Sequence, residues 1–441
     1  MPEKPKSKVR PVLPSGFRDF GPQEVRRRRA VFDTLIRLFE RFGYEPLETP
    51  AVELLSVLLG KYGEEGDRLL FRILNSGDFL EGVPPEAYRE SRALLPYITE
   101  KALRYDLTVP MARWVAQHAG QLVFPFKRYQ IQPVWRADRP QRGRFREFYQ
   151  CDADIVGAEG LVPLLEMVAL VREGLTAIGV QGAVFHLNHR ALLEQAALET
   201  GWPADQLPAF CTILDKADKI GWPAVQQLFV EQGYTLPAWL DPKAPPEVLW
   251  NTLQAIPSLA ADLTSLRQLL QAPTDAMSVR WDVTLARGLE YYTGYVYEVR
   301  VPGSGVGSIA AGGAYASLVK EFGGPDLPAM GISFGIERIL TLLEQQTPAS
   351  AVQPQPVLVA WIDASPSYIY RVVKHFHQAG IAAFAFPAPK KLKAQLDYAQ
   401  RRGLRWVAIV GATEEAHETF QLRDLIQHTQ VVRSLNEPPL P

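Results

Sequence analysis

The segment TPASAVQPQP at residues 347–356 is rich in proline, alanine, serine and glutamine, and it has neither helical nor strand periodicity. A segment of this kind predicts a linker, so the chain of 441 residues should fold as more than one domain. Residues 357–441 begin with VLVAWID, a helix ending at Gly380, IAAFAFP, a helix ending at Gly403 and LRWVAIVG. Short strands that alternate with helices predict a small parallel-sheet α/β domain.

Residues 1–346 have a different pattern, typical of an α+β domain. Residues 22–43 carry apolar residues at helical spacing and end in glycine, which predicts a helix. FPFKRYQIQPVWRADRP and RGRFREFYQCDADIVG predict two strands joined by a basic hairpin, and GISFGIERIL predicts a strand that leads into a helix. Residues from about 160 to 278 should be mostly helical. GSGVGSIAAGG follows strand-forming residues without opening a clear helix, which favours a glycine-rich hairpin over a phosphate-binding loop.

Composition excludes several classes of protein. No run of about eighteen uncharged apolar residues predicts a membrane span. The N-terminal MPEKPKSKVRPVLPSG is basic and proline-rich without a following apolar stretch, so it is not typical of a secretory signal. The two cysteines, Cys151 and Cys211, form no disulfide framework and no metal-binding pair, and no zinc cluster or catalytic triad is apparent. We therefore expect a cytoplasmic protein without a metal centre of its own.

The net charge is −1, but the basic residues are clustered. They gather at Arg26–Arg29, between Arg136 and Arg146, and around Lys390 and Arg402, and such patches can hold a polyanion although the chain as a whole is not basic. Four successive arginines point all round a helix, so we interpret Arg26–Arg29 as a solvated surface.

Arginines and carboxylates recur in or beside apolar strands, where an ionic group is costly unless it is paired or used. These residues are Asp106, Arg136, Arg146, Asp154, Arg287, Glu290 and Arg338. A salt-bridge network would explain any one of them. Several guanidinium groups in one cleft would instead indicate a polyphosphate site, because their forked donors match anionic oxygens.

Several motifs carry a resemblance to a known family. RADRPQRGRFREFYQCDADIVG resembles motif 2 of class II aminoacyl-tRNA synthetases, and GISFGIERIL resembles motif 3. LRYDLTVP, LARGLEYYTG and PSGFRDFGPQE are similar to segments of histidyl-tRNA synthetases, and KKLKAQLDYAQRRGLRWVAIVG is similar to their anticodon-binding domain. The resemblance implies a class II catalytic domain over residues 1–346, with an antiparallel sheet flanked by helices and a helical insertion. It also implies a C-terminal α/β anticodon-binding domain over residues 357–441.

The implied activity is histidine–tRNA ligation, in which ATP activates histidine before its transfer to the 3′ end of tRNA(His). The resemblance assigns Arg136 and Arg287 to catalysis, and Arg136, Phe148, Arg287 and Arg338 to ATP, which would arrive with Mg²⁺. It assigns Asp106, Thr108, Gln150, Asp154, Tyr291, Tyr292 and Tyr315 to histidine. Arg139 and Gln141 would contact the acceptor end of tRNA. The resemblance also implies a homodimer with its interface near residues 42–59.

One departure leaves an alternative open. The family usually has GGRYD where this chain has GGAYA, at Gly312–Ala316, so an arginine and an aspartate are replaced by Ala314 and Ala316. The alternative is a catalytically impaired paralogue, such as the regulatory subunit of ATP phosphoribosyltransferase. That protein typically lacks the terminal domain, which favours the ligase for this chain.

Overall fold

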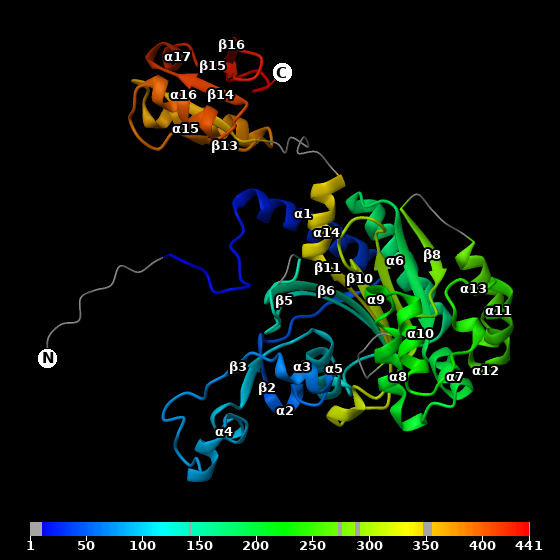
Figure 1. Cartoon of the computed structure of the whole chain (residues 1–441). Helices are drawn as coiled ribbons and strands as arrows, with labels where there is room; N and C mark the ends of the chain where they lie inside the picture. The colour runs from blue at the N-terminus through cyan, green and yellow to red at the C-terminus, as the bar shows by residue number, and fades with distance from the viewer. Residues whose placement is uncertain (1–10, 141–142, 272–275, 287–291, 347–354, 441) are drawn as a thin grey trace. The chain divides into compact units, whose positions relative to one another are not determined.

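The structure of the chain is a computed structural model that describes residues 11–140, 143–271, 276–286, 292–346 and 355–440 (Figure 1). It divides into two compact units between residues 347 and 348. No helix within the described ranges is both long and apolar enough to cross a membrane.

An eight-stranded sheet organises the first unit, in the order β1-β5-β6-β11-β10-β9-β7-β8. The strands are β1 (Glu45–Pro46), β5 (Phe126–Trp135), β6 (Glu147–Val156), β7 (Ala183–His189), β8 (Met277–Trp281), β9 (Tyr292–Arg300), β10 (Ala310–Tyr315) and β11 (Ala329–Gly335). The six strands from β5 to β7 in this order pair antiparallel, as expected, whereas β1 pairs parallel to β5 and β8 parallel to β7. The sheet is therefore mixed, with parallel pairs at both edges.

Three long helices pack on one face of this sheet. They are α1 (Pro22–Arg41), α6 (Leu161–Ile178) and α14 (Ile336–Gln346). The apolar stripe of α1, which includes Val31, Leu35 and Phe39, is buried because these residues recur every four positions. Arg28 is buried on the same helix with 5% of its surface exposed, so the solvated interpretation is wrong for this arginine. The described side chains of Arg26, Arg27 and Arg29 are exposed.

The opposite face carries a smaller subdomain. A three-stranded sheet pairs β2 (Val52–Leu54) and β3 (Arg72–Ile73) with β4 (Lys101–Leu103). Its helices are α2 (Leu55–Leu58), α3 (Gly63–Arg68), η1 (Pro85–Arg89), α4 (Ser91–Ile98), α5 (Thr108–His118) and, after β10, η4 (Lys320–Phe322). A second apolar cluster joins α2 and α5 to β9 and β10. The segment before α5 is thereby held over the central sheet.

Short helices fill most of the region between β7 and β8. They are α7 (Arg190–Thr200), η2 (Ala204–Gln206), α8 (Leu207–Leu214), α9 (Ala217–Ile220), α10 (Trp222–Val230), η3 (Ala238–Leu240), α11 (Pro246–Ala255), α12 (Pro257–Ala260) and α13 (Leu263–Leu270). The helical expectation for this stretch missed β7, which enters the central sheet between β9 and β8.

The second unit has a five-stranded sheet in the order β13-β12-β14-β15-β16. Its elements are β12 (Val357–Trp361), α15 (Pro366–Gln378), β13 (Ala383–Ala385), α16 (Leu392–Arg401), β14 (Trp406–Val410), α17 (Ala412–Ala416), β15 (Thr419–Asp424) and β16 (Thr429–Ser434). The first three strands are parallel and agree with the expected βαβαβ pattern, and the antiparallel pair β15–β16 extends them. Separate apolar clusters place α15 and α16 on opposite faces.

Candidate active site

A cavity of about 450 Å³ lies between the central sheet and the segment before α5, and residues at the start of α14 also line it. Nine of the residues assigned by resemblance line it: Asp106, Thr108, Arg136, Phe148, Gln150, Asp154, Tyr292, Tyr315 and Arg338. They come from the start of α5, the end of β5, and from β6, β9, β10 and α14. The fold thus brings together side chains that are up to 232 positions apart (338 − 106) in the sequence.

The remaining assigned residues are not part of this lining. Arg139 is exposed, on the connection between β5 and β6. Arg287, Gln141 and Tyr291 lie outside the described residues, as does Glu290.

Strand β6 runs along the length of the cavity. Phe148, Gln150 and Asp154 alternate with Cys151 and the following odd-numbered residues, which enter the core on the other face. Residues two apart in a strand are separated by about 6.5–7 Å. The alternation therefore spaces an aromatic ring, an amide and a carboxylate along one wall of the cavity.

Asp154 is held at one end of this row. Arg128, which is fully buried, places Nη2 2.8 Å from Oδ2 of Asp154, and the hydroxyl of Tyr315 donates to Oδ1 at 2.7 Å. Burial raises the pKa of Asp154, while Arg128 and Tyr315 oppose that rise. Gly331 leaves space for the carboxylate, because a Cβ on this glycine would lie 1.8 Å from Oδ1. A rigid, oriented carboxylate of this kind suits recognition of a ring N–H group.

Asp106 lies between β4 and α5. Its Oδ1 accepts from the hydroxyl of Tyr62 at 2.8 Å and from the backbone N–H of Val109 at 3.3 Å. Burial raises the pKa of Asp106, and the hydrogen bond from Tyr62 opposes that rise.

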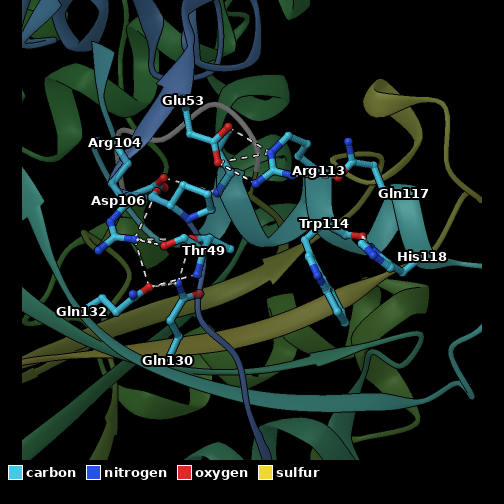
Figure 2. Close-up of polar contacts among 12 residues, drawn as sticks. Thr49, Glu53, Arg104, Asp106, Arg113, Trp114, Gln117, His118, Gln130 and Gln132 are labelled. Carbon is cyan, nitrogen blue, oxygen red and sulfur yellow. Dashed lines mark hydrogen bonds and ion pairs between the residues drawn. The ribbon is translucent and has the colours of Figure 1, made fainter. Parts of the chain in front are cut away.

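A buried arginine fixes the backbone that carries Asp106 (Figure 2). Arg104 is 1% exposed and donates to the carbonyl of Thr49 at 2.6 Å, the carbonyl of Pro133 at 2.9 Å and Oε1 of Gln132 at 2.9 Å. The segment before α5 is thereby attached to both β5 and the chain before β2. Sequence reasoning did not assign Arg104, since the motif LRYDLTVP does not show which carbonyls will surround it.

Cationic groups gather at the other end of the cavity. Nε of Arg136 donates to the carbonyl of Tyr105 at 3.1 Å, and its guanidinium carbon lies 5.1 Å from the ring centre of Phe148. Nη1 of Arg338 donates to the carbonyl of Ser308 at 2.7 Å. Each of these bonds uses one guanidinium nitrogen and fixes the group's position, as a site for a nucleotide requires.

Three cavity-side features were missed by the sequence analysis. Asp152, between Gln150 and Asp154 on β6, lines the cavity and is 2% exposed. Glu337 also lines the cavity and forms a 2.8 Å ion pair with Arg28. The third feature is Arg128, which forms an ion pair with Asp154. Strand alternation in QCDADIV could have drawn attention to Asp152, because it shares the parity of the two assigned side chains.

The GGAYA segment retains the geometry that the cavity needs. A Cβ on Gly312 would lie 2.0 Å from the carbonyl oxygen of Gly331, so this close approach of β10 and β11 requires glycine. Tyr315 reaches Asp154 without charged neighbours at positions 314 and 316. Ala314 is 2% exposed and belongs to the apolar cluster on the opposite face of the sheet.

Comparison with known proteins covers both units. Residues 16–83 and 99–339 match the family model described as Histidyl-tRNA synthetase, and residues 356–437 match that described as Anticodon binding domain. Proteins named histidine–tRNA ligase from Christiangramia forsetii and Cytophaga hutchinsonii are 40% and 38% identical to this chain. The alignments cover 94% and 97% of this chain, and 95% and 98% of those proteins.

Solved structures agree with these matches. A histidyl-tRNA synthetase from Nostoc sp. PCC 7120 superposes with a TM-score of 0.76 at 29% identity and covers 97% of both chains. A Bacillus halodurans chain titled ATP phosphoribosyltransferase regulatory subunit/histidyl-tRNA synthetase gives a TM-score of 0.67 at 19% identity, with coverage of 90% of this chain and 97% of that one. The latter similarity concerns the fold alone.

Proposed function

This chain belongs to the histidyl-tRNA synthetase family, and from that premise we propose how its cavity joins histidine to tRNA(His). The enzyme is an aminoacyl-tRNA ligase that uses ATP. The observation that carries the residue assignments is the cavity itself, since nine side chains chosen from sequence motifs surround one space of about 450 Å³.

In the first step, the carboxylate of histidine attacks the α-phosphorus of ATP. A P–O bond forms to the amino acid, the bond to the β-phosphate oxygen breaks, and diphosphate leaves. Arg136 and Arg287 stabilise the charge that develops on the α-phosphate, Arg338 binds the outer phosphates, and Phe148 stacks on adenine. This step depends on alignment and charge stabilisation more than on a general base.

The substrate's side chain is recognised at the Asp154 end. Asp154 and Tyr315 bind one ring nitrogen, and Tyr292 lines the ring pocket. Tyr291 is assigned to histidine binding by the family resemblance alone. Asp106, Thr108 and Gln150 bind the amino-acid backbone. A site that pairs polar ring atoms rejects apolar side chains of similar size, because those would leave buried groups unpaired.

Mg²⁺ enters as part of the substrate MgATP. Within the described ranges, no three His, Cys, Asp or Glu side chains come together in a cluster that could hold a metal. The ion would therefore be held chiefly by the phosphate oxygens, which suits its preference for oxygen ligands and retained water.

In the second step, a hydroxyl of the terminal ribose of tRNA(His) attacks the activated carbonyl, and AMP leaves. Arg139, which is exposed, and Gln141 contact the acceptor end. The C-terminal unit, matched by the anticodon-binding model, binds the anticodon region.

The functional form is a cytoplasmic homodimer with its interface near residues 42–59. Val52, Leu54 and Leu59 in this range are 37–51% exposed, which leaves apolar surface for a partner subunit. Both cysteines are buried and unpaired, in keeping with a reducing compartment.

The non-charging paralogue is not favoured. The curated relatives that cover nearly the whole chain are ligases, and the terminal domain is present. The deciding experiment is histidine-dependent ATP–pyrophosphate exchange followed by charging of tRNA(His). We expect both activities. Absence of exchange by folded protein would refute ligase activity, and exchange without charging would indicate a tRNA-independent ligase.

A further inference from the structure

Two buried acceptor oxygens in the cavity have no donor within the described part of the chain. Among the residues that the structure describes, no hydrogen-bond donor meets Oδ1 of Asp152 or Oε1 of Gln150. Both side chains line the cavity from successive same-face positions of β6. A buried acceptor without a donor costs about 1–3 kcal/mol, so two together indicate a site completed by a ligand.

The orientation of this pair is set by Ser333 on β11. Ser333 lies directly across the strand pair from Asp152, and its hydroxyl oxygen accepts from Nε2 of Gln150 at 3.2 Å. With Nε2 engaged there, the amide presents Oε1 as its remaining acceptor. Ser333 also hydrogen-bonds the carboxylate of Asp152, so both side chains are held in place before any ligand binds.

The neighbouring carboxylates already have partners. Asp154 is paired with Arg128 and accepts from Tyr315, whereas Asp106 accepts from Tyr62 and Val109. Among the described residues, the charged groups that act on Asp152 are Arg128 on β5, Asp154 on β6 and Asp106 before α5. Because Arg128 is paired with Asp154, Asp152 has no cation of its own in this group.

We propose that Asp152 is a substrate-binding residue, which binds the α-ammonium group of substrate histidine together with Oε1 of Gln150 and the carboxylate of Asp106. An ammonium group has three N–H donors and no acceptor, which matches three acceptor groups. Asp152 also lies between Gln150 and Asp154 on β6. This order matches histidine, whose ammonium group lies between its reacting carboxylate and its ring. This inference rests on the proposed function, because it takes histidine as the ligand.

The test compares Asp152→Asn with the wild-type chain at pH 8, using calorimetric binding of three small molecules. Histidine and histidinol carry the ammonium group and the ring, whereas 3-(imidazol-4-yl)propionate lacks only the ammonium group of histidine. We expect the variant to bind histidine and histidinol about 10- to 100-fold more weakly, as for loss of a charge-assisted hydrogen bond. Binding of the propionate should change less than about threefold, or become tighter as a negative charge is removed.

Asp282→Asn serves as the matched control, because Asp282 is a largely buried aspartate bound to His186 and is not among the residues that line the cavity. It should leave all three dissociation constants within about twofold of wild type. Unchanged histidine binding in Asp152→Asn would overturn the inference, and so would equal weakening of all three ligands, which would indicate a merely structural role. If the wild-type protein bound histidine but catalysed no pyrophosphate exchange, the proposed function would be refuted. The binding of the three ligands to wild type and to Asp152→Asn would still support or refute the ammonium site.

Discussion

Replacing Asp152 by asparagine should make the ligand-free protein more stable at pH 8. The pKa of Asp152 is raised from 3.8 to about 7, chiefly by burial and also by nearby Asp154, while Arg128 opposes the rise. At pH 8 the folded protein must therefore carry a carboxylate whose charged form is disfavoured by its surroundings. Asparagine has nearly the same shape without the charge.

The magnitude follows from proton linkage. The folded state holds a proton between about pH 3.8 and 7 that the unfolded chain has released, so stability falls as pH rises through this range. A pKa that rises from 3.8 to about 7 on folding costs the protein at most about 4 kcal/mol of stability. This loss of stability is complete above pH 7 and absent below pH 3.8. The gain in Asp152→Asn should be of this order at pH 8 and small at pH 4.

The same reasoning predicts a change in stability of the opposite sign for Asp282→Asn. Burial would raise its pKa, but hydrogen bonds from His186 and Thr284 outweigh burial and lower the pKa to about 2. This carboxylate contributes stability above pH 3.8 that is lost as pH falls through 2. Asp282→Asn should therefore destabilise the protein at pH 8 by about 2 kcal/mol.

Guanidinium chloride unfolding of both variants between pH 4 and 8, without histidine, provides the measurement. A separate unfolding curve with histidine identifies the transition of the catalytic unit, because the bound ligand shifts that transition to higher denaturant concentration. The reasoning would be refuted if Asp152→Asn were less stable than wild type at pH 8. It would also be refuted if its advantage did not grow between pH 4 and 8.

The remaining predictions concern other parts of the cavity. Gly331→Ala should raise the KM for histidine at least tenfold with the fold retained, because its Cβ would lie 1.8 Å from Oδ1 of Asp154; a normal KM in pyrophosphate exchange would contradict this. Ala314→Arg should lower the free energy of unfolding by several kcal/mol, since it places a charge in an apolar cluster, and a gain in activity would show that the missing arginine matters. Arg287→Ala should slow adenylation about 100-fold in single-turnover assays, and a near-normal rate would refute its assigned role.

Local patterns were sufficient for much of the fold. The strand–helix alternation after residue 356 and the apolar stripe of α1 depend on short stretches of chain, and the structure has the corresponding elements. Residues 347–354 of the predicted linker lie outside the described residues. β7 was missed because a single strand inside a long helical region gives little periodicity of its own. Its place in the sheet depends on pairing with β8 and β9, which lie about 90 residues downstream or more.

Sequence motifs were sufficient to assign side chains to the site, but the partners of those side chains became known only from the fold. Residues such as Gln150 and Asp154 were chosen because RFREFYQCDADIVG resembles motif 2 of class II synthetases, and their spacing in a strand puts them on one face. Arg28 was misinterpreted because its partner, Glu337, is 309 positions away. Arg104 could not be interpreted because the carbonyls it binds belong to two other segments.

The sequence by itself determined the family, the two-part organisation and the side chains available for chemistry. Only the tertiary structure decided which of those charges are paired and which acceptors remain open. Asp152 and Asp154 are two residues apart in one strand, yet Asp154 has Arg128 and Tyr315 while Oδ1 of Asp152 has no donor among the described residues. The physical reason is that the energy of a buried charge depends on what lies across the sheet from it, and distant segments supply those neighbours.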